Sequence, residues 1–109
     1  MMKFEIDIAR DFSEVPAGRT DKDGEFNGER FRRHVLIPAL AAHEFINVRL
    51  EGTEGFGSSF LEEAFGGLVR VHGFSKAEIV RRISFSATTS AARKYLRRIN
   101  QILSERAND

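Results

Sequence analysis

The sequence GFGSSFLEEAFGGLV, from Gly55 to Val69, decides the fold of this chain. A glycine-flanked loop passes two serines and enters a run whose apolar residues recur at steps of three and four, the period of a helix with one buried face. Ser59 and Glu62 have the spacing of a capping box, which predicts a helix over about 59–72. The predicted buried stripe consists of Leu61, Ala64, Phe65, Leu68, Val69 and His72.

Segments on either side of this helix alternate between strand patterns and helix patterns. Strands are predicted at residues 4–8, 45–50 and about 81–86. Further helices are predicted from Gly28 or Glu29 to about Ala42, near 76–80, and from Thr88, Thr89 or Ser90 to about Glu105. Pro38 is expected to kink the first of these helices or to end its regular part. Strands that alternate with helices imply an α/β arrangement, a small sheet with helices packed on it.

Length and composition favour one globular domain spanning residues 1–109, with phenylalanine as the main bulky core residue, since the chain has ten Phe and no Trp. The absence of cysteine excludes disulfides and thiolate chemistry and suits a reducing cytosol. Charges interrupt the apolar residues at the N-terminus, and no apolar run approaches the ~20 residues that a membrane span needs. We therefore expect a cytoplasmic protein without a membrane segment.

Charge is unevenly distributed, although the net charge is only +1. Residues 1–64 carry 8 Lys and Arg against 13 Asp and Glu, whereas residues 65–109 carry 9 against 3. This asymmetry is either incidental to solvated helix exteriors or marks a basic face for a partner such as nucleic acid. The residues of that alternative basic patch are Arg81, Arg82, Arg93, Lys94, Arg97 and Arg98.

Catalytic chemistry is hard to assemble from the residues present. A nucleophile would be Ser58 or Ser59, but only Gly57 stands close enough to resemble a nucleophile elbow, and His72 lies too far along the same predicted helix to act as its base. The sequence has no phosphate-binding Gly-x-x-x-x-Gly-Lys loop, no His-Glu-x-x-His motif and no paired metal ligands. We therefore expect no enzyme activity, metal or cofactor; a small hydrolase that uses the two serines is the third hypothesis.

The serines themselves permit two interpretations. Free backbone amides at a helix start favour negative charge, so a phosphate on Ser58 or Ser59, carrying roughly −1.5 to −2 charge, would be tolerated there and would change the face shown to a partner. Alternatively, both hydroxyls only cap the helix and bind loop amides.

Several blocks of sequence resemble a known family. The strongest runs from Gly57 to Leu68, and the supporting blocks are residues 4–9, 11–13, 16–19 and 27–32. In these residues the chain resembles the STAS-like domains of unknown function, which are related to bacterial anti-sigma factor antagonists. The resemblance implies a small mixed sheet flanked by helices and a role in binding another protein.

In the antagonists, a histidine-kinase-like ATPase phosphorylates a serine at the start of the helix after the central strand. Their Asp-Ser-Ser-Gly-Leu pattern, laid over this chain without gaps, places Ser58 at the phosphorylated serine and Ser59 next to it. Gly57 stands in place of the aspartate and Phe60 in place of the glycine, so the chain departs from the pattern at two positions.

These observations lead to one preferred hypothesis and one alternative. The preferred reading is a non-catalytic regulatory module that binds a protein, either a histidine-kinase-like ATPase or a transcription regulator, and is switched by serine phosphorylation. Phe60 is read either as core or as an exposed interface anchor. The predicted contact face comprises Gly57, Ser58, Ser59, Phe60, Glu62 and Glu63. The alternative is a nucleic-acid-associated module that uses the basic C-terminal helix.

Overall fold

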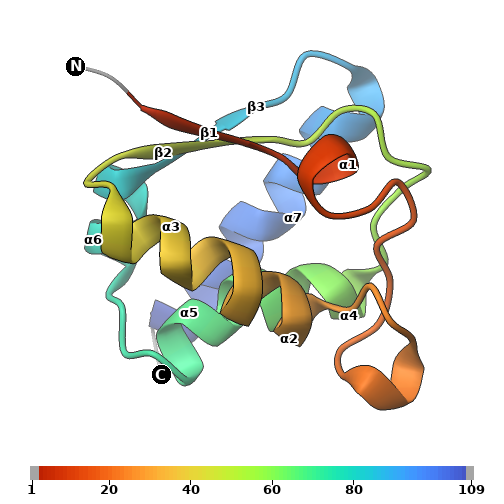
Figure 1. The fold of residues 1–109 in the computed structure, drawn as a ribbon. Helices are drawn as coiled ribbons and strands as arrows, with labels where there is room; N and C mark the ends of the chain where they lie inside the picture. The colour runs from red at the N-terminus through yellow and green to blue at the C-terminus, as the bar shows by residue number, and fades with distance from the viewer. Residues whose placement is uncertain (1–2, 108–109) are drawn as a thin grey trace.

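A three-stranded sheet lies on one side of the molecule and helices cover one of its faces (Figure 1). The computed structural model describes residues 3–107. The strands are β1 (Phe4–Asp7), β2 (Ile46–Arg49) and β3 (Ile83–Ser86). The α-helices are α1 (Ile8–Asp11), α2 (Gly28–Phe31), α3 (Ile37–Ala42), α4 (Ser58–Leu61), α5 (Gly67–Arg70), α6 (Lys76–Arg82) and α7 (Ser90–Ala107). The other helical segments are the 3-10 turn η1 (Asp21–Asp23) and the π-type segments η2 (Arg32–Leu36) and η3 (Glu62–Gly66).

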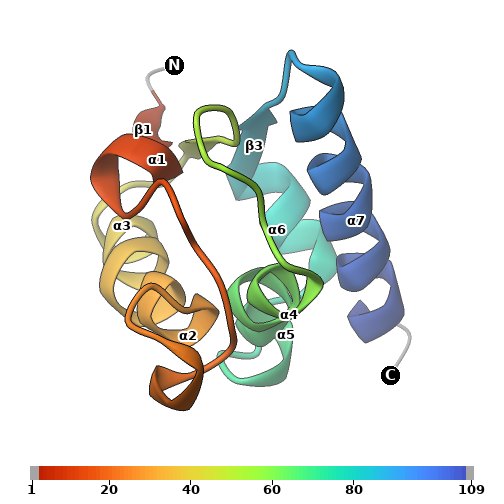
Figure 2. The same ribbon diagram turned by 90° about the vertical axis from the view of Figure 1, so that its right-hand side faces the viewer.

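The strands follow the order β1-β2-β3 and both pairings are parallel. Parallel neighbours need a crossover connection, and here each crossover is helical. The predicted α/β arrangement, a small sheet with helices packed on it, is confirmed, but the described strands are all parallel, which corrects the expected mixed sheet. Figures 1 and 2 show helices α2 to α5 and α7 on the same side of the sheet.

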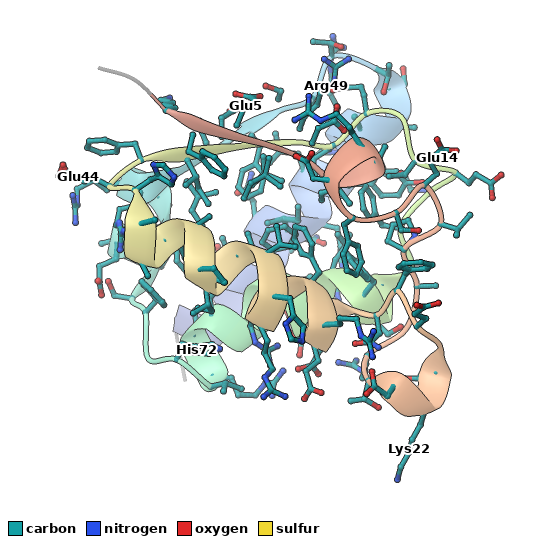
Figure 3. All side chains as sticks on the ribbon, in the orientation of Figure 1. Glu5, Glu14, Lys22, Glu44, Arg49 and His72 are labelled. Carbon is teal, nitrogen blue, oxygen red and sulfur yellow. The ribbon has the colours of Figure 1, made fainter. Side chains whose placement is uncertain are left out.

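The sheet therefore has one apolar face and one polar face. Side chains alternate along each strand, so Ile6, Val48 and Phe85, which share a register position, face the helices. The opposite face carries Glu5 and Arg49, which point away from the helices in Figure 3.

Hydrogen bonds tie the three strands together across the polar face. The Asn47 side chain on the central strand donates to Glu5 Oε1 (2.7 Å) and Ser86 Oγ (2.8 Å), and it accepts a hydrogen bond from Ser84 Oγ (2.7 Å). Parallel sheets are usually covered on both faces; here side-chain hydrogen bonds take the place of the second cover.

The helix over 28–42 is continuous, as predicted, but it passes through Pro38 without ending. Asn27 caps its start, because its side-chain oxygen accepts the Arg30 amide at 2.9 Å. Immediately before the proline the helix widens, and the Ile37 amide bonds to the carbonyl of Arg32, five residues back. Proline removes one helical donor, and the wide turn absorbs the mismatch, as π-type turns do.

Two further helix starts agree with the sequence. Ser75 and Glu78 form the predicted capping box of α6, and the helix extends two residues beyond the expected 76–80. Thr89 accepts the Ala92 amide at 3.1 Å and so caps α7, one of the three residues proposed for that place.

Phenylalanine dominates the space between sheet and helices, as the composition predicts. Phe31, Phe60 and Phe65 are fully buried and their rings contact one another or share neighbours, with centroids 5.9 Å apart for Phe31 and Phe60 and 6.2 Å for Phe31 and Phe65. Within residues 3–107, every helix is too short or too polar to cross a bilayer.

Candidate functional site

Ser58 stands at the start of the helix that follows the central strand, and it is exposed. The loop before it runs alongside α7 (Figure 2). At Gly55, φ is +135° and a Cβ would lie 2.9 Å from the Tyr95 hydroxyl oxygen, so this position needs glycine both for its backbone conformation and for the approach to α7. The loop brings Ser58 to the surface beside α7.

Neither serine caps the helix. Gly57 is the capping residue, and its carbonyl accepts the Leu61 amide at 3.2 Å, while no side chain at the cap position bonds to the first turn. The predicted Ser59–Glu62 capping box is therefore wrong. The helix begins one residue earlier than expected, so Ser58 and Ser59 occupy its first turn, and Glu62 instead pairs with Arg19 (3.6 Å) and Arg70. Ser59 is half-buried.

Two residues of the predicted contact face belong to the interior. Phe60 has no exposed surface, and its ring lies 5.7 Å from that of Phe56. Glu63 is only 7% exposed. Phe60 lies four residues before Ala64, which is also fully buried, so Phe60 belongs to the same buried stripe. A wider predicted apolar face that began one turn earlier would have included it. Of the other residues of the predicted contact face, Gly57 and Ser58 are exposed, and Ser59 and Glu62 are half-buried.

Helix α7 forms the other wall of a surface groove that opens at Ser58. The groove has a volume of about 990 Å³, and Phe56, Leu61 and Tyr95 contribute apolar surface to its lining. The rings of Phe56 and Tyr95 meet edge to face at 5.1 Å, which fixes Tyr95 against the loop. Arg98 Nε donates to Ser58 Oγ at 3.3 Å, so the serine hydroxyl and a cation on α7 already touch.

The groove carries more positive than negative charge. Lys94, Arg97 and Arg98 line it, and Glu105 is the carboxylate among its lining residues. Glu105 lies two turns further along α7 and 3.8 Å from Arg98, with its own side chain largely exposed, so it offsets only part of the charge.

The six basic residues predicted as one patch lie in different surroundings. Arg82 is half-buried and donates to the carbonyls of Leu40, His43 and Glu44, which anchors α6 to the end of α3. Arg81 and Arg93 are exposed but do not line the groove. The patch divides into a structural arginine, two peripheral ones and the three groove cations.

Sequence reasoning treated Ser58 and the basic helix as alternatives, whereas the structure brings them together. Ser58 and Arg98 are forty residues apart in the chain, and no local periodicity reports a contact of that range. The uneven charge of the two halves of the chain pointed to a basic surface, but it could not show which residues of α7 lie beside the loop.

A buried ion pair lies behind the site, where η2 and η3 meet. Arg32 is 2% exposed, and its Nη1 donates to the Glu63 carboxylate at 2.7 Å and to the Glu63 carbonyl. Arg32 Nε donates to His72 Nε2 at 3.2 Å, and Arg70 lies 3.4 Å from the same carboxylate. His72, predicted in the buried stripe, is instead exposed (Figure 3), and it serves as an acceptor at the rim.

This ion pair explains Gly67, and the contacts with Glu62 and α7 explain Gly66. A Cβ on Gly67 would lie 2.1 Å from Arg32 Nη1, and one on Gly66 would lie 2.3 Å from Glu62 Oε2 and 3.0 Å from Ile102 Cγ2. Glycine inside a helix costs about 1 kcal/mol relative to alanine. Here the absence of a side chain at both positions leaves space for the Arg32 guanidinium and for α7.

Glu63 is expected to make the domain less stable in acid. Burial acts to raise the pKa of Glu63, but the hydrogen bond from Arg32 and the charges of Arg70 and Arg32 outweigh it, so the pKa lies below its ordinary value of 4.5. The folded state favours the ionised carboxylate, so this contribution is fully present above pH 4.5 and is lost as the pH falls through the folded-state pKa.

Urea unfolding from neutral pH into the acid range checks this expectation. The wild type should lose stability more steeply than Glu63→Gln, since other carboxylates with lowered pKa, such as those of Asp11 and Glu51, titrate in both proteins. Equal slopes for the two proteins would show that Glu63 has no part in the acid response.

Among residues 3–107, no group of three or more His, Asp and Glu side chains is placed to hold a metal ion. What the described residues offer is an exposed hydroxyl, three cations and an apolar floor. These groups suit recognition of a negatively charged partner surface.

A one-sided parallel sheet, with an exposed serine opening the helix after its central strand, places the chain among small α/β domains of STAS-like architecture. A family model described as a STAS-like domain of unknown function matches residues 27–92, more than half of the chain. The chain belongs to that family, as its sequence blocks predicted. No curated protein and no solved structure matches it.

Proposed function

We propose that this STAS-like domain is a regulatory module that binds another protein through the exposed turn Gly57–Ser59 and the groove beside it. The observation that carries the proposal is the position of Ser58. Its hydroxyl is exposed at the mouth of an apolar groove and touches a cation of the opposite wall. Buried residues behind the turn hold it in place, so the turn presents a fixed surface, which lowers the entropic cost of binding.

Phosphorylation of Ser58 is the switch in this proposal. A phosphoserine carries roughly −1.5 to −2 charge and three acceptor oxygens. Arg98 Nε already lies 3.3 Å from Ser58 Oγ, so a phosphate there would meet a guanidinium without a large rearrangement. It would also reverse the sign of the charge at the mouth of the groove. Ser59, half-buried and deeper in the first turn, is the weaker site for modification.

The partner class is taken from the resemblance to the anti-sigma factor antagonists. We propose a histidine-kinase-like ATPase that modifies Ser58, or a transcription regulator released or captured by that modification. The domain itself carries out no chemistry in this scheme. His72, in the turn after α5, contacts Arg32 at the opposite end of the helical run from Ser58, so it is not positioned as a base for the serine.

Affinity capture with three forms of the chain tests the proposal. We expect wild type and Ser58→Ala to retain the same partner, an ATPase or a transcription regulator, and Ser58→Glu to alter its recovery by about tenfold, which corresponds to about 1.4 kcal/mol. Arg93→Glu is the control for added negative charge, because Arg93 is exposed on α7 and does not line the groove.

Two results bear on separate parts of the proposal. If all forms recover the partner equally, the turn is not part of the surface that contacts the partner. Incubation of the chain with ATP and a recovered ATPase, followed by mass spectrometry of the peptide containing Ser58 and Ser59, tests the switch; absence of phosphate on both serines would leave binding without phosphorylation.

A further inference from the structure

The groove between the Ser58 turn and α7 is lined by three chemically distinct zones. Tyr95, which is half-buried, offers apolar surface over the buried Phe56 and Leu61. Lys94, Arg97 and Arg98 offer positive charge, and Ser58 stands at the mouth. A volume of about 990 Å³ lies at the upper end of what binding pockets in proteins enclose. The groove is therefore large enough for several side chains of a partner, with charge on one wall.

We infer that this groove takes a short acidic segment of the protein partner, with apolar side chains of that segment against the ring of Tyr95. This inference rests on the proposed function and names the chemistry of the partner's contact. Charge complementarity indicates an acidic occupant. Lys94 and Arg97 are exposed. Among the side chains that the structure describes, the lining carboxylate, Glu105, pairs with Arg98, which leaves the other two cations to an incoming carboxylate.

The apolar surface in the groove favours a partner segment that also carries apolar side chains over a purely ionic contact. Tyrosine and phenylalanine serve as anchors at interfaces because they bury a large area with few rotatable bonds. Tyr95 is half-buried and already packs edge to face on Phe56, so its ring needs no ordering when a partner arrives. An acidic segment with apolar residues on one face satisfies both zones, as amphipathic peptides do in other grooves.

Ser58 connects this occupant to the phosphorylation switch. A phosphate on Ser58 would take the guanidinium of Arg98, which lies 3.3 Å from the hydroxyl oxygen. It would also repel the carboxylates of the segment at the mouth of the groove. The phosphate and the acidic segment thus compete for the positive charge of Arg98, so phosphorylation releases the segment.

Fluorescence anisotropy with labelled peptides tests the inference. The probe is a short peptide of glutamates with leucines at helical spacing, and the comparison probe has lysines in place of the glutamates. We expect the acidic probe to bind, the lysine probe to bind at least about tenfold more weakly, and added salt to weaken the acidic probe because exposed charges are screened.

Variants of α7 locate the site. The double variant Lys94→Glu/Arg97→Glu should weaken the acidic probe by about tenfold or more. Arg93→Glu, on the same helix but outside the groove, should change it by less than about twofold. All three residues are exposed, so far-ultraviolet circular dichroism should show unchanged folding. Ser58→Glu should weaken the probe in the same direction as the double variant.

Each contrary result has a definite meaning. No binding of the acidic probe, equal binding of the lysine probe, or an equal loss with Arg93→Glu overturns the assignment of an acidic segment to this groove. Displacement of the probe by duplex DNA would assign the cations to nucleic acid instead. If the acidic probe fails while the captured partner still distinguishes Ser58→Glu from wild type, this inference falls and the proposed function stands. If the probe binds but no partner distinguishes them, the proposed function falls.

Discussion

Arg32→Met is expected to lower the free energy of unfolding by about 3 kcal/mol, because it leaves the Glu63 carboxylate buried without its closest cation. Glu63 is 7% exposed and accepts from Arg32 Nη1 at 2.7 Å. Arg70, 3.4 Å from the same carboxylate, retains part of the compensation, which places the loss at the lower end of the range for a broken buried pair. Urea unfolding monitored by circular dichroism measures it.

Two further variants make this result specific. Arg33→Met, on the same helical segment but exposed, should change stability by less than about 0.5 kcal/mol. The double variant Arg32→Met/Glu63→Met removes both buried charges and should recover most of the loss, since well-packed apolar replacements of buried pairs are often neutral. A double variant as unstable as Arg32→Met would show that packing around Arg32, and not the unpaired carboxylate, causes the loss.

Gly28→Ala is expected to destabilise the domain by about 2–3 kcal/mol, within the range of overpacked cores. A Cβ at residue 28 would lie 2.6 Å from the Phe60 carbonyl oxygen and 3.0 Å from the Ala64 amide nitrogen. Both atoms are backbone and cannot rotate away, so α2 and the central helix would have to separate. Alanine normally stabilises a helix relative to glycine, so the expected sign is opposite to the helix propensity.

Gly57→Ala provides the matched comparison at the start of the other helix. Its backbone has a φ of −70°, and the nearest side-chain atom to a Cβ is 4.0 Å away. We expect a loss of at most about 1 kcal/mol, because alanine is somewhat less favourable than glycine at a helix cap. Equal losses at both positions in thermal or urea unfolding would contradict the claim that close backbone contact fixes residue 28 as glycine.

Local patterns in the sequence were sufficient for most of the fold. Period-two alternation located all three strands, and Asn27, Ser75 and Thr89 marked helix starts because caps are read from neighbouring residues. The Ser59–Glu62 pair failed because the same spacing also arises inside a helix, where Gly57 had already taken the cap position. Pro38 does not end the helix, but the regular α-helical pattern gives way to the wide turn η2 just before it, and this turn satisfies the backbone around the proline.

Long-range features of the site lay beyond such patterns. Glu63 reads as a surface charge in sequence, and only its pairing with Arg32, thirty-one residues away, permits its burial. Gly66 and Gly67 signalled a close approach, but not that its occupants are a guanidinium and a side chain of α7. The contact of Ser58 with Arg98 required the loop and α7 to be placed in space.

The most direct test of the account is where a bound partner contacts the domain. With the captured partner added to isotope-labelled chain, nuclear magnetic resonance should report changes at Ser58, Tyr95 and Arg98, and these changes should weaken with Ser58→Glu. Changes confined to the open polar face of the sheet, at Asn47 and Ser84, would contradict the claim that the Ser58 groove is the contact surface.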